Sequence, residues 1–113
     1  LTTAARWRSE YEWWAHARMA REHGVDDAVI DAIGRGQEPP FNLDDERVVH
    51  AVAQQLGRTG RIDSDIYQRA VEALRDRGVV ELVSLCGYYA LVSFTLNAFE
   101  VELPSGVPLT WER

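Results

Sequence analysis

Residues 79–99 read VVELVSLCGYYALVSFTLNAF and are apolar on nearly every side. A helix of this kind lies buried among neighbours, between subunits or in a membrane, whereas a surface helix has a single apolar stripe. The length approaches that of a membrane span. Polar side chains recur along it, however: Glu81, Ser84, Ser93, Thr95 and Asn97. Because such groups are costly in lipid, we interpret the segment as a central helix, buried among other helices or between subunits.

Glycine, proline and helix-capping residues divide the rest of the chain into shorter helical segments. The spacing of apolar residues predicts helices over these ranges: about 3–23, 27–35, 43–58 and 64–77. We expect Asn42 and Asp63 to cap the third and fourth helices, and Gly24 and Gly78 to end the first and fourth. No strand-like alternation of useful length and no internal repeat is present. The predicted fold class is all-α, with about five helices in one compact domain over residues 1–113.

The composition limits the partners and the compartment. The formal net charge is −6 with no block of like charges, which argues against a nucleic-acid partner. The single cysteine, Cys86, excludes an internal disulfide framework and a Cys-x-x-Cys pair, and we interpret it as a core residue. Arg6 and Arg8 interrupt any apolar run near the start, so no signal peptide is visible. We expect a cytoplasmic protein with no membrane partner.

The first predicted helix carries Glu12 and His16 four residues apart, on one helix face. A carboxylate beside an imidazole fixes its tautomer and raises its basicity, which makes a small proton-transfer device. An exposed ion pair is the common alternative at this spacing. Three aromatic residues surround the pair and favour a buried or pocket-lining helix: Tyr11, Trp13 and Trp14.

Metal binding is the other chemistry that Glu12 and His16 suggest. A site needs at least one or two further ligands, and the remaining histidines, His23 and His50, do not complete a set by their spacing. The sequence therefore predicts neither a metal nor a cofactor.

Several motifs in this order resemble the carboxymuconolactone decarboxylase and alkylhydroperoxidase-D-like family. The matching stretches are SEYEWWAHAR at 9–18, Ala20-Arg21, Gly24-Val25, GVVELV at 78–83, Gly87-Tyr88-Tyr89 and LNAFEV at 96–101. The resemblance implies an all-helical domain that assembles as a homo-oligomer, a trimer or a hexamer. Family members carry a further helical segment before the motif helix. Since the chain starts at Leu1, we expect it to lack that segment.

The peroxidase branch of this family has two cysteines where this chain has Ser9 and Glu12, and these residues cannot cycle between dithiol and disulfide. The branch without that cysteine pair removes CO2 from a small carboxylated lactone without a cofactor. The resemblance thus implies Glu12 and His16 as catalytic residues, and we expect Ser9, Trp13 and Tyr88 to bind the substrate. A non-catalytic binding or assembly subunit is the alternative function, and a peroxidase-related activity is a third.

Overall fold

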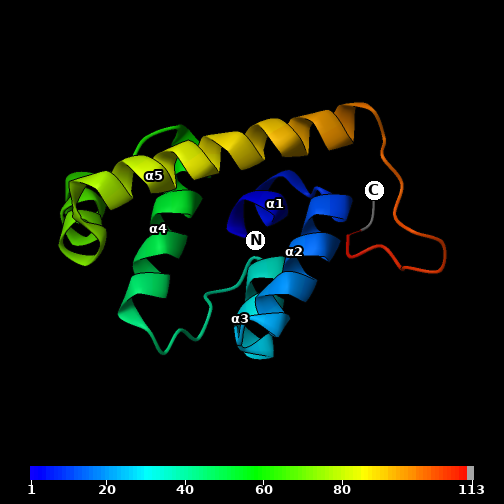
Figure 1. Cartoon of the computed structure of the whole chain (residues 1–113), viewed down its shortest axis with the longest axis horizontal. Helices are drawn as coiled ribbons and strands as arrows, with labels where there is room; N and C mark the ends of the chain where they lie inside the picture. The colour runs from blue at the N-terminus through cyan, green and yellow to red at the C-terminus, as the bar shows by residue number, and fades with distance from the viewer. Residues whose placement is uncertain (112–113) are drawn as a thin grey trace.

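The computed structural model describes residues 1–111, and within them the chain is all-helical, as predicted (Figure 1). The five helices are α1 (Thr2–Trp7), α2 (Glu10–Glu22), α3 (Asp27–Gly34), α4 (Asp44–Thr59) and α5 (Ser64–Ala98). Figure 1 shows α5 running along one edge of the molecule, with α1, α2 and α4 beneath it. No strand occurs in this described part of the chain.

The core has two parts, and α1 lies between them. One part joins α1, α2 and α3 through these buried residues: Ala4, Trp13, Ala17, Val29, Ile30, Ile33 and Phe41. The other joins α4 and α5 through Val48, Val52, Ala70, Val79 and Leu82. Because α1 contacts α3 as well as α4 and α5, it holds the two halves together.

The prediction of one helix over 3–23 was wrong, because the chain turns at Arg8. Arg8 adopts left-handed backbone angles, with φ 48° and ψ 43°, and ends α1. The amide of Ser9 then donates to the carbonyl of Ala4 at 3.0 Å, which closes the turn. A non-glycine residue pays a cost of about 1–2 kcal/mol in this conformation. The break lets α1 pack on α4 and α5 while α2 packs on α3.

The boundary predicted at Gly78 was also misplaced. The bend within α5 lies at Arg75, where φ is 62° and ψ is 174°. Gly78 serves close packing after the bend, since a Cβ atom there would lie 2.8 Å from the Cβ of Leu74. The glycine is thus required by the tight approach of the two helical pieces rather than by a helix end.

Two predicted caps are confirmed and one is not. The Asp63 carboxylate accepts a hydrogen bond from the amide of Ile66 at 2.9 Å, as an N-cap does. Gly24 follows α2 with φ 85°, as expected of a glycine after a helix end. Asn42 does not cap α4, because the capping position falls on Leu43 and no side chain fills it.

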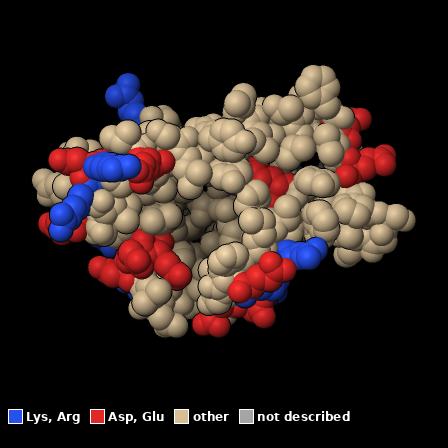
Figure 2. All heavy atoms as spheres, in the orientation of Figure 1, with Lys and Arg blue, Asp and Glu red and all other residues tan. Residues whose placement is uncertain are grey.

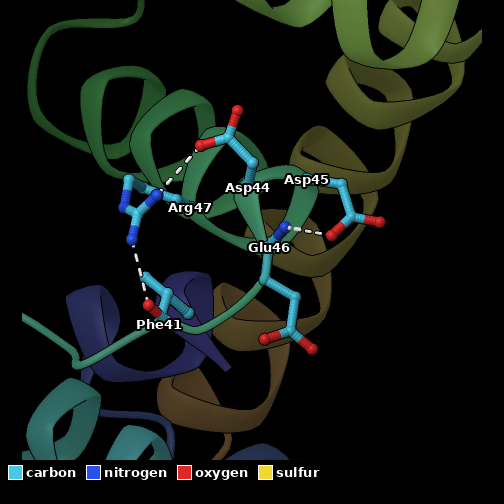
Figure 3. A network of polar contacts seen from close by, with 5 residues as sticks. All are labelled: Phe41, Asp44, Asp45, Glu46 and Arg47. Carbon is cyan, nitrogen blue, oxygen red and sulfur yellow. Dashed lines mark hydrogen bonds and ion pairs between the residues drawn. The ribbon is translucent and has the colours of Figure 1, made fainter.

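An arginine fastens the start of α4 instead (Figure 3). The guanidinium of Arg47 donates to the Asp44 carboxylate at 2.9 Å and to the carbonyl of Phe41 at 3.0 Å. These bonds tie the loop before α4 to the first turn of the helix, where the Asp45 carboxylate accepts from the amide of Glu46 at 2.8 Å.

The tail after α5 returns to the first half of the chain. The Glu10 carboxylate accepts hydrogen bonds from the amides of Thr110 and Trp111, at 2.9 and 2.7 Å. The indole of Trp111 donates to the carbonyl of Gly34 at 2.9 Å and packs against Trp13, with ring centroids 5.3 Å apart. Trp111 therefore packs the end of the described chain against α2 and α3.

The second half of α5 is less buried than its composition predicts. By length and composition, α5 as a whole is the one helix among residues 1–111 that is long and apolar enough to cross a membrane, which is weak evidence because core helices pass the same test. Its exposed apolar side chains are Val80, Val83, Leu85, Tyr88, Leu91 and Phe94, which we call the α5 apolar face. Figure 2 shows largely uncharged atoms along the middle of α5, with charged residues at both ends of the molecule and along its lower edge. Burial of this segment among helices of one chain is therefore incomplete.

Candidate functional site

Glu12 and Ser93 form a buried polar pair between α2 and α5. Their side chains are 3% and 0% exposed, and the Ser93 hydroxyl donates a hydrogen bond to the Glu12 carboxylate. Burial raises the pKa of the Glu12 carboxyl above its ordinary value, while the Ser93 hydrogen bond and the nearby His16 oppose the shift. A carboxyl group in this setting holds its proton at a higher pH than an exposed glutamate does.

His16 lies one turn further along α2 and is half-buried. Its Nδ1 is 2.9 Å from the backbone carbonyl of Glu12, and its Nε2 is 3.2 Å from the Tyr89 hydroxyl. A carbonyl oxygen only accepts, so Nδ1 carries a proton and, in the neutral ring, Nε2 accepts from Tyr89. We had predicted that the Glu12 carboxylate fixes this tautomer, and that detail is corrected: the Glu12 backbone does so.

The site is therefore two pairs of residues, each spaced by one helical turn, facing each other across a helix contact. Glu12 and His16 come from α2, and Ser93 and Tyr89 come from α5. One turn beyond Ser93, the side-chain amide Nδ2 of Asn97 donates to the backbone carbonyl of Trp7 at 2.8 Å. Tyr89, Ser93 and Asn97 thus form a polar stripe that fixes α5 on α1 and α2.

The sequence contained the signal for two residues that the predicted site lacked. Ser93 and Tyr89 stand four residues apart, and continuing back along the same face leads to Cys86 and Leu82. These four residues form the less exposed side of α5. Following the 3.6-residue period along the apolar helix would have selected Tyr89 over its neighbour Tyr88.

Tyr88 and Trp13 lie away from the Glu12–His16 pair. Tyr88 is 57% exposed and its ring packs edge-on against Tyr89. Trp13 is 7% exposed and lies in the core, close to Gly34, where a Cβ atom would come within 2.8 Å of the indole. Tyr88 therefore reaches the site only through Tyr89, whose ring also packs against His16, and the roles of Tyr88 and Trp13 in substrate binding stay predictions.

Ser9 is fully buried just before α2, and its hydroxyl has no hydrogen-bond partner among the described residues. Ser9 and Glu12 have the spacing of a capping box, but the Ser9 side chain makes no capping bond and the Glu12 side chain turns to Ser93. Ser9 lies in the wall of a cavity of about 330 Å³, together with Arg8 and Asn97. Among the described residues, the Ser9 hydroxyl is therefore a polar group that still lacks a hydrogen-bond partner.

The cavities, the possible metal ligands and the cysteine bear on which chemistry the site could perform. Of the four cavities that we describe, none has Glu12 or His16 in its wall. Within residues 1–111, no group of three or more His, Cys, Asp and Glu side chains is placed to hold a metal ion. Cys86 is half-buried and unpaired, and burial raises the pKa of its thiol, which disfavours the reactive thiolate.

No protein-family model, no curated protein and no solved structure matches this chain.

Proposed function

We propose that the chain is a cofactor-independent, decarboxylase-like enzyme of the carboxymuconolactone decarboxylase-like class, acting on a small carboxylated or lactone-type substrate. One observation carries the proposal: a buried carboxyl group with a raised pKa lies one turn from a histidine whose tautomer is fixed. Groups held in such states are typical of proton-transfer sites.

The chemistry needs a proton at one defined step. Loss of CO2 breaks the bond between the carboxylate and the ring, and the electron pair remains on carbon as a dienolate. A new C–H bond then forms as an N–H bond of the His16 ring breaks, and the ring regains its proton from solvent. His16 is half-buried, so it can exchange protons with both solvent and a bound molecule, while Tyr89 orients its Nε2. Because burial raises the pKa of the Glu12 carboxyl, this group favours its neutral form more than an exposed glutamate does, which limits negative charge beside the developing dienolate.

We further propose that the working form is a homo-oligomer in the cytoplasm, a trimer or a hexamer. The α5 apolar face supports the association, since Tyr88 is 57% and Leu91 61% exposed. Burying such side chains gains about 25 cal/mol per Å² of apolar area. Tyr88 packs edge-on against Tyr89, so a second copy seated over Tyr88 would lie beside the ring that contacts His16.

A binding or assembly subunit without turnover is the second candidate. It is favoured by the cavities described above, none of which includes Glu12 or His16 in its wall. In that case the Glu12–Ser93 bond serves only to fix α5 on α2.

The test is CO2 release from a panel of carboxylated unsaturated lactones. We expect turnover in the native chain and a loss of about 10²–10⁴-fold in kcat in His16→Ala, the usual contribution of a proton-transfer residue. Tyr89→Phe should lower kcat, whereas the matched variant Tyr88→Phe should retain it, because only Tyr89 contacts His16. No CO2 release with any lactone, or full activity in His16→Ala, would overturn the proposed enzyme.

Sedimentation or light scattering of the same samples tests the assembly. Leu91→Glu places a charge on the α5 apolar face and should give monomers if a second copy covers it. If Leu91→Glu instead abolishes binding to lipid vesicles without changing the oligomeric state, the face meets a membrane and the assembly proposal is wrong.

A further inference from the structure

The largest cavity that we describe lies away from Glu12 and His16, where α1, α3, α4 and the C-terminal tail meet. Its volume is about 520 Å³, and its wall includes Arg6, Arg8, Arg35, Arg58 and His50. We propose that this arginine-lined cavity binds a small organic oxyanion, a molecule bearing phosphate or carboxylate groups.

The distribution of charge is the first argument. The chain carries a net charge of −6, yet four of its twelve basic residues, all of them arginines, line one cavity, and no aspartate or glutamate among residues 1–111 lies in its wall. The ion pairs found within residues 1–111 use other arginines: Arg18, Arg21, Arg47 and Arg77. Four like charges around one space repel each other, so an anion between them relieves the repulsion.

The second argument is that one of these arginines is held in place. The Nε of Arg6 donates to the carbonyl of Gly57 at 2.7 Å, and its guanidinium lies 5.1 Å from the centre of the Trp7 ring. A Cβ atom at position 57 would come within 3.1 Å of the Arg6 side chain, so the glycine allows this approach. A guanidinium fixed through Nε keeps its terminal nitrogens for bidentate contact with a carboxylate or phosphate.

The third argument is an unsatisfied polar group in the same wall. His50 is 8% exposed, and its Nδ1 lies 2.9 Å from the Thr2 hydroxyl. Its Nε2 is buried without a hydrogen-bond partner among the described residues. Buried polar atoms are nearly always paired in native proteins, so the wall of this cavity includes a residue with one hydrogen-bonding position still open.

The size and the remaining wall indicate an organic molecule rather than a bare ion. Ligand pockets typically have volumes of about 300–1,000 Å³, and this cavity falls within that range. Ile33 and Trp111 give it an apolar side, on which the carbon part of a ligand can pack. The arginines then hold the anionic end.

The test is isothermal titration calorimetry of the purified chain with pyrophosphate and, separately, with citrate. The two arms distinguish a phosphate-bearing from a carboxylate-bearing ligand. The double variant Arg35→Gln/Arg58→Gln removes two cavity arginines that are both exposed at the surface, so the fold should persist, which circular dichroism verifies. The matched control is Arg61→Gln/Arg69→Gln, which removes the same charge from exposed residues outside the cavity wall.

We expect at least one probe to bind at millimolar concentration or below, with a loss of tenfold or more in affinity in the cavity variant and little change in the control. Failure of both probes to bind the native chain overturns the proposal. Equal weakening in the two double variants also overturns it, because binding would then follow net charge alone. Neither result depends on lactone turnover, so the outcome is independent of the proposed enzyme.

Discussion

The contact between α2 and α5 and the arginine-lined cavity satisfy their polar groups in opposite ways. At the helix contact, the Glu12 side chain is paired with Ser93 and the ring of His16 is bonded at both nitrogens. In the cavity, Arg8, Arg35 and Arg58 line a shared space whose wall, as far as the structure describes it, holds no acidic residue. The first region is stable as it stands and suits the movement of a proton. The second is incomplete without an anion, so it is the region where we expect a bound molecule to stabilise the fold.

Ser93→Ala is expected to lower the free energy of unfolding more than the other variants below, because it removes the hydrogen bond between Ser93 and Glu12 at the helix contact. The variant leaves the Glu12 carboxyl buried without its partner, which costs about 1–3 kcal/mol in the free energy of unfolding. Urea denaturation measures the loss. Ser84→Ala is the control, since Ser84 is exposed on the same helix and bonds only the carbonyl of Val80. Equal losses in both variants would contradict a special role for the buried pair.

Glu12→Gln sharpens the comparison with a smaller effect, since a carboxamide still offers Ser93 an acceptor. In the native protein the folded-state pKa of Glu12 is raised above the ordinary value of 4.5. Between these two pKa values the folded state holds a proton that the unfolded chain has lost, so the free energy of unfolding falls as pH rises across this window. In Glu12→Gln, the free energy of unfolding should no longer fall with pH across this window. The variant should therefore become more stable relative to the native chain as pH rises. An unchanged slope would mean that Glu12 is not desolvated.

Arg58→Gln should have the smallest effect on stability and the opposite sign. Removing one of four like charges in the cavity relieves repulsion, so we expect a change within about 0.5 kcal/mol, neutral or stabilising, by thermal unfolding at low salt. Arg47→Gln is the contrasting variant and should destabilise, since Arg47 bonds both Asp44 and Phe41. A clear loss in Arg58→Gln would show that this arginine already has a partner.

The sequence predicted those features of the fold that depend on nearby residues alone. Helix existence followed from apolar spacing, and the cap at Asp63 and the turn at Gly24 followed from residue type. The break at Arg8 could not be predicted, because no glycine or proline marks it and the packing of α1 imposes the left-handed turn. Gly78 was misread because close packing and helix termination call for the same residue.

The α2–α5 contact and the arginine-lined cavity also differ in how far the sequence could predict them. Glu12, His16 and their partners on α5 lie on regular helical faces, so periodicity was sufficient in principle to find Tyr89 and Ser93. The arginines of the cavity come from three separate segments around residues 6–8, 35 and 58, with no shared motif or spacing. Only the tertiary arrangement brings them together.

The bonds from Glu10 to Thr110 and Trp111 also set an order on synthesis. They join residues about a hundred positions apart, so the first three helices leave the ribosome long before their last wall exists. Closing so long a loop is entropically costly and comes late in folding. A nascent chain that ends short of Trp111 already carries the four arginines of the cavity but lacks the apolar side that this indole supplies.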